Sequence, residues 1–271
     1  MLENKINTEQ DKVLFELSPQ GVAQVILNNP EKHNAFDDNI ISQLKNLFLD
    51  IAKRDDIKIV VLSSKGKNFS AGADLGWMKR MASYSYEDNV KDASELAKML
   101  HALNFLPQTT IAQIQGAAFG GAVGLASCCD IVIASDKASF CLSEVKLGLI
   151  PATISPYVVQ AMGVKACRRY FQTAERFYAQ KALSLGLVDE VVESHLLTMK
   201  VDEMVSTLLL NSPAAMKAAK QLIVDVAHKE INDHLLTQTS EQIASIRVSK
   251  EGQEGLTAFF EKRKPSWQID S

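Results

Sequence analysis

Residues 116–130 read GAAFGGAVGLASCCD, and nearly every side chain in this stretch is small and uncharged. It lies between two β-like runs, TIAQIQ (110–115) and DIVIAS (130–135). In a segment that runs from a strand through glycines into a helix, the first backbone N–H groups of the helix have no helical acceptor. Because the glycines carry no side chains, a ligand oxygen can approach these N–H groups. The stretch therefore predicts either an oxyanion-binding turn or simply a tight contact between a helix and a sheet.

A second segment, NFSAGADLGWMKRM (68–81), has the same order of strand end, small residues and helical stretch. Two N–H groups that converge on one oxygen form an oxyanion hole, and losing one donor typically costs about 10²–10³ in rate. Each segment alone is better explained by tight packing of a helix on a sheet. The pair favours the oxyanion hole.

The pattern of apolar residues predicts an α/β fold, because strands alternate with helices in the first half of the chain. Pro19-Gln20-Gly21 separates two strand-like runs and indicates a hairpin. We expect a core and a helical C-terminal part, packed as one unit. The predicted strands are 13–17, 22–28, 57–63, 110–115, 130–135 and 188–193, and the predicted helices are 37–54, 88–105, 156–173, 179–185, 195–211, 213–229, 231–249 and 252–262.

Composition excludes several classes of function. The chain has 271 residues, 46% of them hydrophobic, and a formal charge of −3, which does not suggest nucleic acid or membrane as a partner. The N-terminus, MLENKINTEQDK, resembles neither a signal peptide nor a transit peptide, so we expect a cytoplasmic protein. Cys128, Cys129, Cys141 and Cys167 lack CxxC spacing, which predicts reduced structural thiols and no metal site.

Glu144, in ASFCLSEVKLGLIP (138–151), is the candidate acid/base. A carboxyl group among apolar residues tends to have a raised pKa and can donate or accept a proton. The alternative is a surface glutamate near Lys146. The sequence contains no GxSxG pattern, so a serine hydrolase is not expected, and its histidines form no HExxH pattern.

The chain resembles the crotonase (enoyl-CoA hydratase/isomerase) superfamily over about 13–267, through FSAGADL, GAAFGGAVGL, SEVKLGLIP, AQKALSLGLVDEVV and GLTAFFEKRKPSW. This resemblance implies a ClpP-like spiral of ββα turns over 1–195 and a C-terminal helical module over 196–271, which builds a homotrimer or a dimer of trimers. It also implies an acyl-CoA substrate, with CoA as part of the substrate and no separate cofactor.

The resemblance also implies roles for individual residues. The N–H groups of Ala73 and Gly121 match the oxyanion donors of the family. Phe259 and Lys262 match positions that reach CoA, often that of a neighbouring subunit, although they could equally form a solvated helix end. The residues matching the remaining CoA contacts are Lys32, His33, Ala35, Ala71, Asp74 and Leu75.

Gly124 departs from the pattern of many hydratases in this family, because it stands where they carry a first glutamate. Glu144 matches the second. One carboxyl could hydrate an enoyl-CoA by giving a proton to Cα and taking one from a water, whereas a Δ3-Δ2 isomerase needs only one base. Gly124 alone favours the isomerase.

A finer resemblance favours the hydratase. FSAGADLGWMKRM, FCLSEVKLGLIPATISPYV and RRYFQTAERF are similar to 3-methylglutaconyl-CoA hydratases of leucine degradation and to γ-carboxygeranoyl-CoA hydratases. That branch also has glycine at the position of Gly124, and the segment 151–156 would reshape the pocket wall. Ala152 matches the extra acidic position of dienoyl isomerases, so that activity is not expected.

Both of these substrates carry a second carboxylate, which needs a cationic partner if it is buried. Lys79 and Arg80 are the candidates, with Arg168 and Arg169 in reserve. The leading hypothesis is thus a hydratase for 3-methylglutaconyl-CoA. A protein that binds RNA or a partner without catalysis is disfavoured, because no dense basic run exists beyond EKRK (261–264).

Overall fold

The computed structural model describes residues 11–268, so the prediction about the N-terminal dozen residues falls mostly outside the described part. Its main sheet has the strand order β1-β2-β3-β4-β6-β9. The first pair is the predicted antiparallel hairpin, and the other neighbours are parallel, which confirms the α/β fold. The strands are β1 (Val13–Leu17), β2 (Val22–Leu27), β3 (Ile59–Ser64), β4 (Thr109–Ile114), β6 (Ile131–Ser135) and β9 (Glu190–Val192).

A smaller sheet lies beside the main one, with the order β5-β7-β8. Its strands are β5 (Ala117–Phe119), β7 (Ser139–Cys141) and β8 (Phe177–Tyr178). The sequence did not predict these strands, because runs of two or three residues are too short to show a period. The expectation that only 188–193 is extended after Leu149 is therefore wrong at β8.

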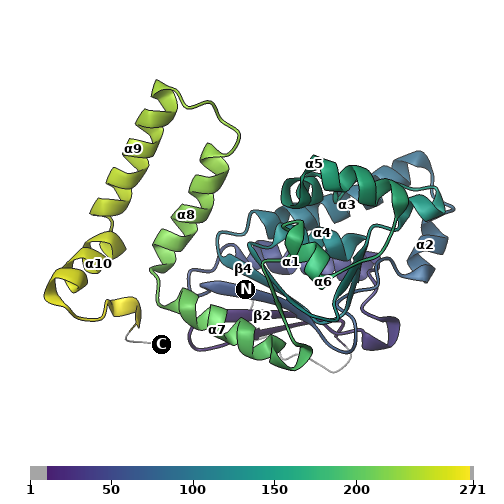
Figure 1. Ribbon diagram of the computed structural model, residues 1–271, viewed down its shortest axis with the longest axis horizontal. Helices are drawn as coiled ribbons and strands as arrows, with labels where there is room; N and C mark the ends of the chain where they lie inside the picture. Colours follow the sequence, from purple (N-terminus) through teal and green to yellow (C-terminus); the bar gives the residue numbers. More distant parts are fainter. Residues whose placement is uncertain (1–10, 269–271) are drawn as a thin grey trace.

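Both faces of the main sheet are covered by helices (Figure 1). Val60 and Leu62 of β3 join the larger core cluster, while Ile59 and Val61 join a second cluster with Leu197 on α7. This is why β3 is apolar at successive positions. The helices are α1 (Asp38–Ile51), α2 (Leu75–Met81), α3 (Tyr86–Asn104), α4 (Gly121–Cys128), α5 (Ser155–Thr173), α6 (Ala179–Ser184), α7 (Leu197–Leu209), α8 (Pro213–Val226), α9 (Asp233–Val248) and α10 (Lys250–Glu261).

The helices α8, α9 and α10 form an arm that stands away from the rest of the molecule (Figure 1). Lys220 of α8 ties it to the core by donating to the Asp130 carboxylate at 2.7 Å. The arm leaves large apolar side chains exposed, among them Ile231, Val248 and Phe260. The expectation of one packed unit fits α8, which contacts β4 and donates from Lys220 to Gln108 O, but it fits α9 and α10 less well, because α10 packs on α9 and α8 and the pair stands away from the sheet (Figure 1). The boundary at 195/196 stays a prediction, and α7 beyond it still packs on the sheet.

The four cysteines are unpaired, as the sequence predicts. Among residues 11–268 no helix has both the length and the apolar character needed to cross a membrane.

Candidate active site

The first predicted oxyanion segment is held by two isolated bridges rather than by the strand end expected from the sequence. Phe36 donates its N–H to Gly72 O and accepts from Asp74 N, both at 2.7 Å. Successive peptide groups of an extended chain point in opposite directions. The N–H of Ala73, between those two, therefore points away from Phe36. It makes no hydrogen bond within the described residues.

The second segment is the predicted turn from a strand into a helix. Gly120 follows β5 with φ 52° and ψ −119°, a conformation that favours glycine, and it precedes α4. Its own N–H donates to Cys141 O at 2.9 Å. Gly121 is the first residue of α4, so its N–H has no helical acceptor, and the described residues supply none. The two segments are joined where Ser70 bridges Ala118.

Space explains why the side chains here are small. A Cβ on Gly72 would lie 3.3 Å from Phe119 O, and a Cβ on Gly121 would lie 3.3 Å from the Phe36 ring. Both contacts are tighter than most real Cβ contacts, so larger residues would push the segments apart. The small residues therefore serve packing and also leave the two N–H groups accessible.

Glu144 lies beside this turn rather than on the open surface. A Cβ built on Gly120 would lie 3.3 Å from Glu144 Oε1, which places the carboxyl next to the second segment. Glu144 Oε2 is buried and has no hydrogen-bond partner. Burial raises the pKa of Glu144 above its ordinary value of 4.5, since no cation offsets the loss of solvent. A half-buried carboxyl with a free oxygen can exchange protons with a bound substrate.

Ile154 fills the space where a side chain at position 124 would lie. A Cβ on Gly124 would come within 2.4 Å of Ile154 Cγ2 and 2.9 Å of Ile154 Cβ. Ile154 is almost fully buried. Residues 151–154 line the cavity described below, and the apolar side chain of Ile154 occupies the space beside Gly124. The reshaping of the pocket wall relative to other hydratases stays a prediction.

These groups line one cavity of about 860 Å³. Ala73, Gly121 and Glu144 all contribute to its wall, together with the apolar residues at 149–151 and Ile154. Apolar side chains from α2 and α3 line another part of the cavity. They include Trp77, Met78, Met81 and Leu96. A cavity of this size lies within the range of sites that bind small molecules.

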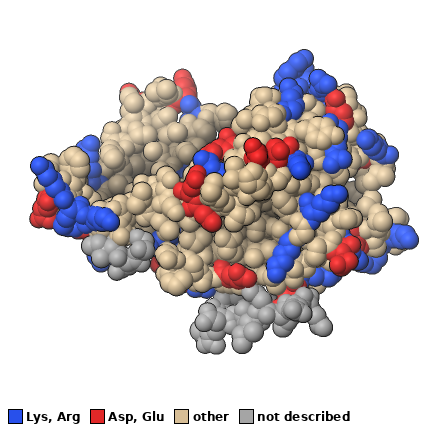
Figure 2. All heavy atoms as spheres, turned by 60° about the horizontal axis from the view of Figure 1, so that its bottom comes forward, with Lys and Arg blue, Asp and Glu red and all other residues tan. Residues whose placement is uncertain are grey.

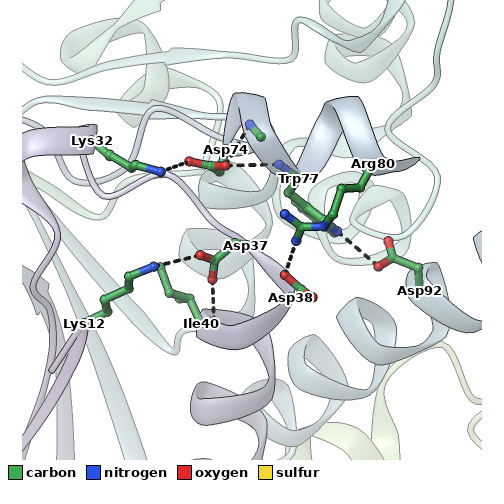
Figure 3. Close-up of polar contacts among 10 residues, drawn as sticks. Lys12, Lys32, Asp37, Asp38, Ile40, Asp74, Trp77, Arg80 and Asp92 are labelled. Carbon is green, nitrogen blue, oxygen red and sulfur yellow. Dashed lines mark hydrogen bonds and ion pairs between the residues drawn. The ribbon is translucent and has the colours of Figure 1, made fainter. Parts of the chain in front are cut away.

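The predicted CoA residues gather near the oxyanion segments. Lys32 Nζ pairs with Asp74 Oδ2 at 2.8 Å (Figure 3). Asp74 also caps α2 by accepting from two backbone N–H groups. His33 O accepts from Ala71 N at 3.0 Å, and Ala71 and Leu75 line the cavity. Phe259 and Lys262 lie apart from this group, on the arm at the other end of the molecule (Figure 1).

The candidate partners for a second carboxylate lie outside the cavity wall. Arg80 Nη2 pairs with Asp38 at 2.5 Å (Figure 3), and Arg169 pairs with Glu175. Lys79 and Arg168 are exposed. In place of a cation, the wall contains Asp92, whose Oδ1 accepts from Trp77 Nε1 at 3.1 Å. Burial is the main cause that raises the pKa of Asp92.

Sequence reasoning missed Asp92, Trp77, Phe36 and the contact of Ile154 with Gly124. Asp92 lies in a long helix rich in charged residues, so only its helical phase relative to Leu96 could have marked it as facing inward. The contact of Ile154 with Gly124 joins positions thirty residues apart and leaves no local pattern.

The fold and the site together present two backbone N–H groups without acceptors in the described residues, those of Ala73 and Gly121, and the carboxyl of Glu144 in the wall of one cavity. A profile of the Enoyl-CoA hydratase/isomerase family matches residues 18–270. The chain belongs to this family, within the crotonase superfamily, and is an enzyme of that type acting on acyl-CoA.

Individual relatives include both activities named for the family. An enoyl-CoA hydratase from Shewanella pealeana is 49% identical, with a TM-score of 0.91 over 95% of this chain and 96% of that chain. The human enoyl-CoA hydratase domain-containing protein 3, mitochondrial, is 32% identical over 91% of this chain and 80% of its own length. The trans-2-decenoyl-(acyl-carrier-protein) isomerase of Streptococcus mutans is 30% identical over 94% of this chain and 97% of its own.

Proposed function

We propose that this enzyme adds water across the Cα=Cβ bond of an enoyl-CoA, with Glu144 as its one catalytic carboxyl. The observation that carries the proposal is the place of Glu144: its buried, unpartnered Oε2 belongs to the same cavity as the free N–H groups of Ala73 and Gly121. The hydratases among the relatives support the same choice.

In the proposed mechanism, the thioester oxygen accepts hydrogen bonds from Ala73 N and Gly121 N, which draws electrons from Cβ. Ionised Glu144 takes a proton from a water molecule as the water oxygen bonds to Cβ. The electron pair of the double bond moves to Cα and onto the thioester oxygen, giving an enolate. Protonated Glu144 then gives its proton to Cα, so one water has been added and the carboxylate is restored.

CoA would lie along Lys32, His33, Ala35, Ala71, Asp74 and Leu75, and no further cofactor or metal is needed in this scheme. Phe259 and Lys262 are too far along the arm to join the site of their own chain. Their contribution would come from a second copy, in a trimer or a dimer of trimers. The exposed apolar residues of the arm support such an assembly. The cytoplasmic location likewise stays a prediction.

A Δ3-Δ2 enoyl-CoA isomerase is the second candidate. The lone carboxyl favours it, since Ile154 fills the position of the first glutamate and the remaining Glu144 could lift and return one proton. The S. mutans relative is named as an isomerase. Binding without catalysis is disfavoured: Figure 2 shows basic and acidic side chains interspersed over the face it displays, rather than a basic stripe.

Ultraviolet absorbance of the conjugated enoyl thioester separates the two reactions. A hydratase removes the band of a 2-enoyl-CoA, whereas an isomerase creates that band from a 3-enoyl-CoA. We expect loss of the band with the wild-type chain and a loss slowed by about 10²–10⁴ with Glu144→Gln. Glu87→Gln, an exposed change on α3, is the matched control. A rising band from a 3-enoyl-CoA, with no loss from any 2-enoyl-CoA, would establish the isomerase instead.

The finer substrate, 3-methylglutaconyl-CoA, stays a prediction from sequence, as does its rarer alternative, γ-carboxygeranoyl-CoA. Either would need a cation, and Arg80 would have to exchange Asp38 for the substrate carboxylate. Both compounds belong in the substrate panel.

A further inference from the structure

The wall formed by α2 and α3 contains one polar pair that the mechanism above does not use. Asp92 is half-buried, and its Oδ1 accepts from the indole N–H of Trp77, which is buried (Figure 3). Both residues line the same cavity as Glu144. Their neighbours in the wall are apolar, among them Met81, Ala93 and Leu96.

The charge of this cavity is one-sided. Among the described residues that line it, the charged side chains are Glu144 and Asp92, and both are acidic. Arg80 lies nearby but outside the wall; its guanidinium is bound to Asp38, and its charge acts on Asp92 less than burial does. A carboxylate in an apolar cavity is stabilised by a cation and repelled by another carboxylate, and the repulsion is larger where solvent is excluded.

We infer that Asp92 is a specificity-determining residue, which selects enoyl-CoA substrates with an uncharged acyl tail and opposes those with a second carboxylate. An uncharged tail can pass over the apolar wall, and a hydroxyl on it could donate to the Asp92 carboxylate. The inference rests on the proposed hydratase function. It predicts that 3-methylglutaconyl-CoA, the substrate suggested by the sequence, is a poorer substrate than an uncharged enoyl-CoA.

Two substrates that differ only in the carboxyl group test this directly. 3-Methylglutaconyl-CoA is 3-methylcrotonyl-CoA with a carboxyl group on one methyl, so the ratio of their kcat/KM values isolates the effect of that charge. We expect the wild-type chain to favour the uncharged substrate. Asp92→Asn should raise the ratio of carboxylated to uncharged substrate about ten-fold or more, since it removes a charge and keeps the shape.

Two further variants separate charge from structure. Trp77→Phe keeps an aromatic side chain, although a smaller one, and removes the N–H donor, so Asp92 keeps its carboxyl and the ratio should stay low. Glu87→Gln removes an acidic group from the same helix on its exposed side and should leave the ratio unchanged. Should Asp92→Asn lose turnover, competition by the unreactive pair glutaryl-CoA and butyryl-CoA still reports the same selectivity as a ratio of inhibition constants.

The outcomes distinguish this inference from the proposed function. A wild-type chain that hydrates both substrates but prefers the carboxylated one overturns the role of Asp92, as does an Asp92→Asn chain with an unchanged ratio. Both results leave the hydratase intact. If the wild-type chain hydrates neither, nor crotonyl-CoA, the proposed function fails.

Discussion

The cavity has two walls, built in different ways. The reaction wall consists of Ala73, Gly121, Glu144 and Ile154, and in the proposed mechanism it acts mainly through the main-chain N–H groups of Ala73 and Gly121, with one carboxyl beside them. The selection wall, from α2 and α3, works through side chains, with Trp77 and Asp92 as its polar pair. The difference implies that changes in the first wall should alter the rate for every substrate, whereas changes in the second should alter the choice among substrates.

Glu144→Gln should have the largest effect, because it removes the only carboxyl assigned to proton transfer. A positioned acid/base contributes about 10²–10⁴ to a rate. We expect kcat to fall by about that factor for every substrate, while the affinity for CoA thioesters changes little. Steady-state kinetics on crotonyl-CoA and 3-methylcrotonyl-CoA, with Glu87→Gln beside it, measures this. A loss confined to one substrate would place Glu144 in selection instead.

Gly121→Pro should come next, since it removes an oxyanion donor while proline is tolerated as the first residue of a helix. The added carbon atoms approach Phe36, so Gly121→Ala, which adds a Cβ but keeps the N–H, is the matched control. We expect Gly121→Pro to be slower than Gly121→Ala by about 10²–10³. Equal rates in the two variants would mean that Gly121 N does not bind the thioester oxygen.

The pair of Gly124 and Ile154 tests the shape of the reaction wall through stability. Gly124→Ala places a Cβ within 2.4 Å of Ile154, so we expect a loss of about 1–3 kcal/mol in the free energy of unfolding. Adding Ile154→Ala removes the nearest methyl, and the double variant should lose less than the two single changes summed. Urea unfolding of the four chains measures this coupling, and simple additivity would show that the contact is not formed.

The smallest effect concerns pH. The raised pKa of Glu144 means that the folded chain holds this proton more tightly than the unfolded chain. Stability should therefore fall as pH rises through that pKa, and Glu144→Gln should lack this fall. Activity should depend on pH in the opposite direction to stability, because the ionised carboxyl takes the proton from water. The value of kcat/KM should therefore drop as pH falls, and the drop should begin above 4.5, the ordinary pKa of a glutamate. Unfolding and kinetics from about pH 4 to about pH 8 test both signs.

The two walls of the cavity also differ in how much of each the sequence could predict. The glycines at 120 and 121 and the carboxyl of Glu144 lie in short local motifs, so the turn and the helix after it could be predicted from neighbouring residues, although the three-residue strand β5 before it could not. Asp92 and Trp77 come together through the packing of two helices, and this contact leaves no mark on either segment. The arm was misjudged for a related reason: an amphipathic helix shows that one face is buried, but not whether its own core or a second copy covers it.

The most direct test of the account is the mass of the product formed from 3-methylcrotonyl-CoA in water enriched in ¹⁸O. We expect the wild-type chain to form a 3-hydroxyacyl-CoA with one heavy oxygen on Cβ, and Glu144→Gln to form almost none in the same time. A product of unchanged mass would mean that a proton was moved and no water added. A labelled product formed at full rate by Glu144→Gln would remove Glu144 from the chemistry.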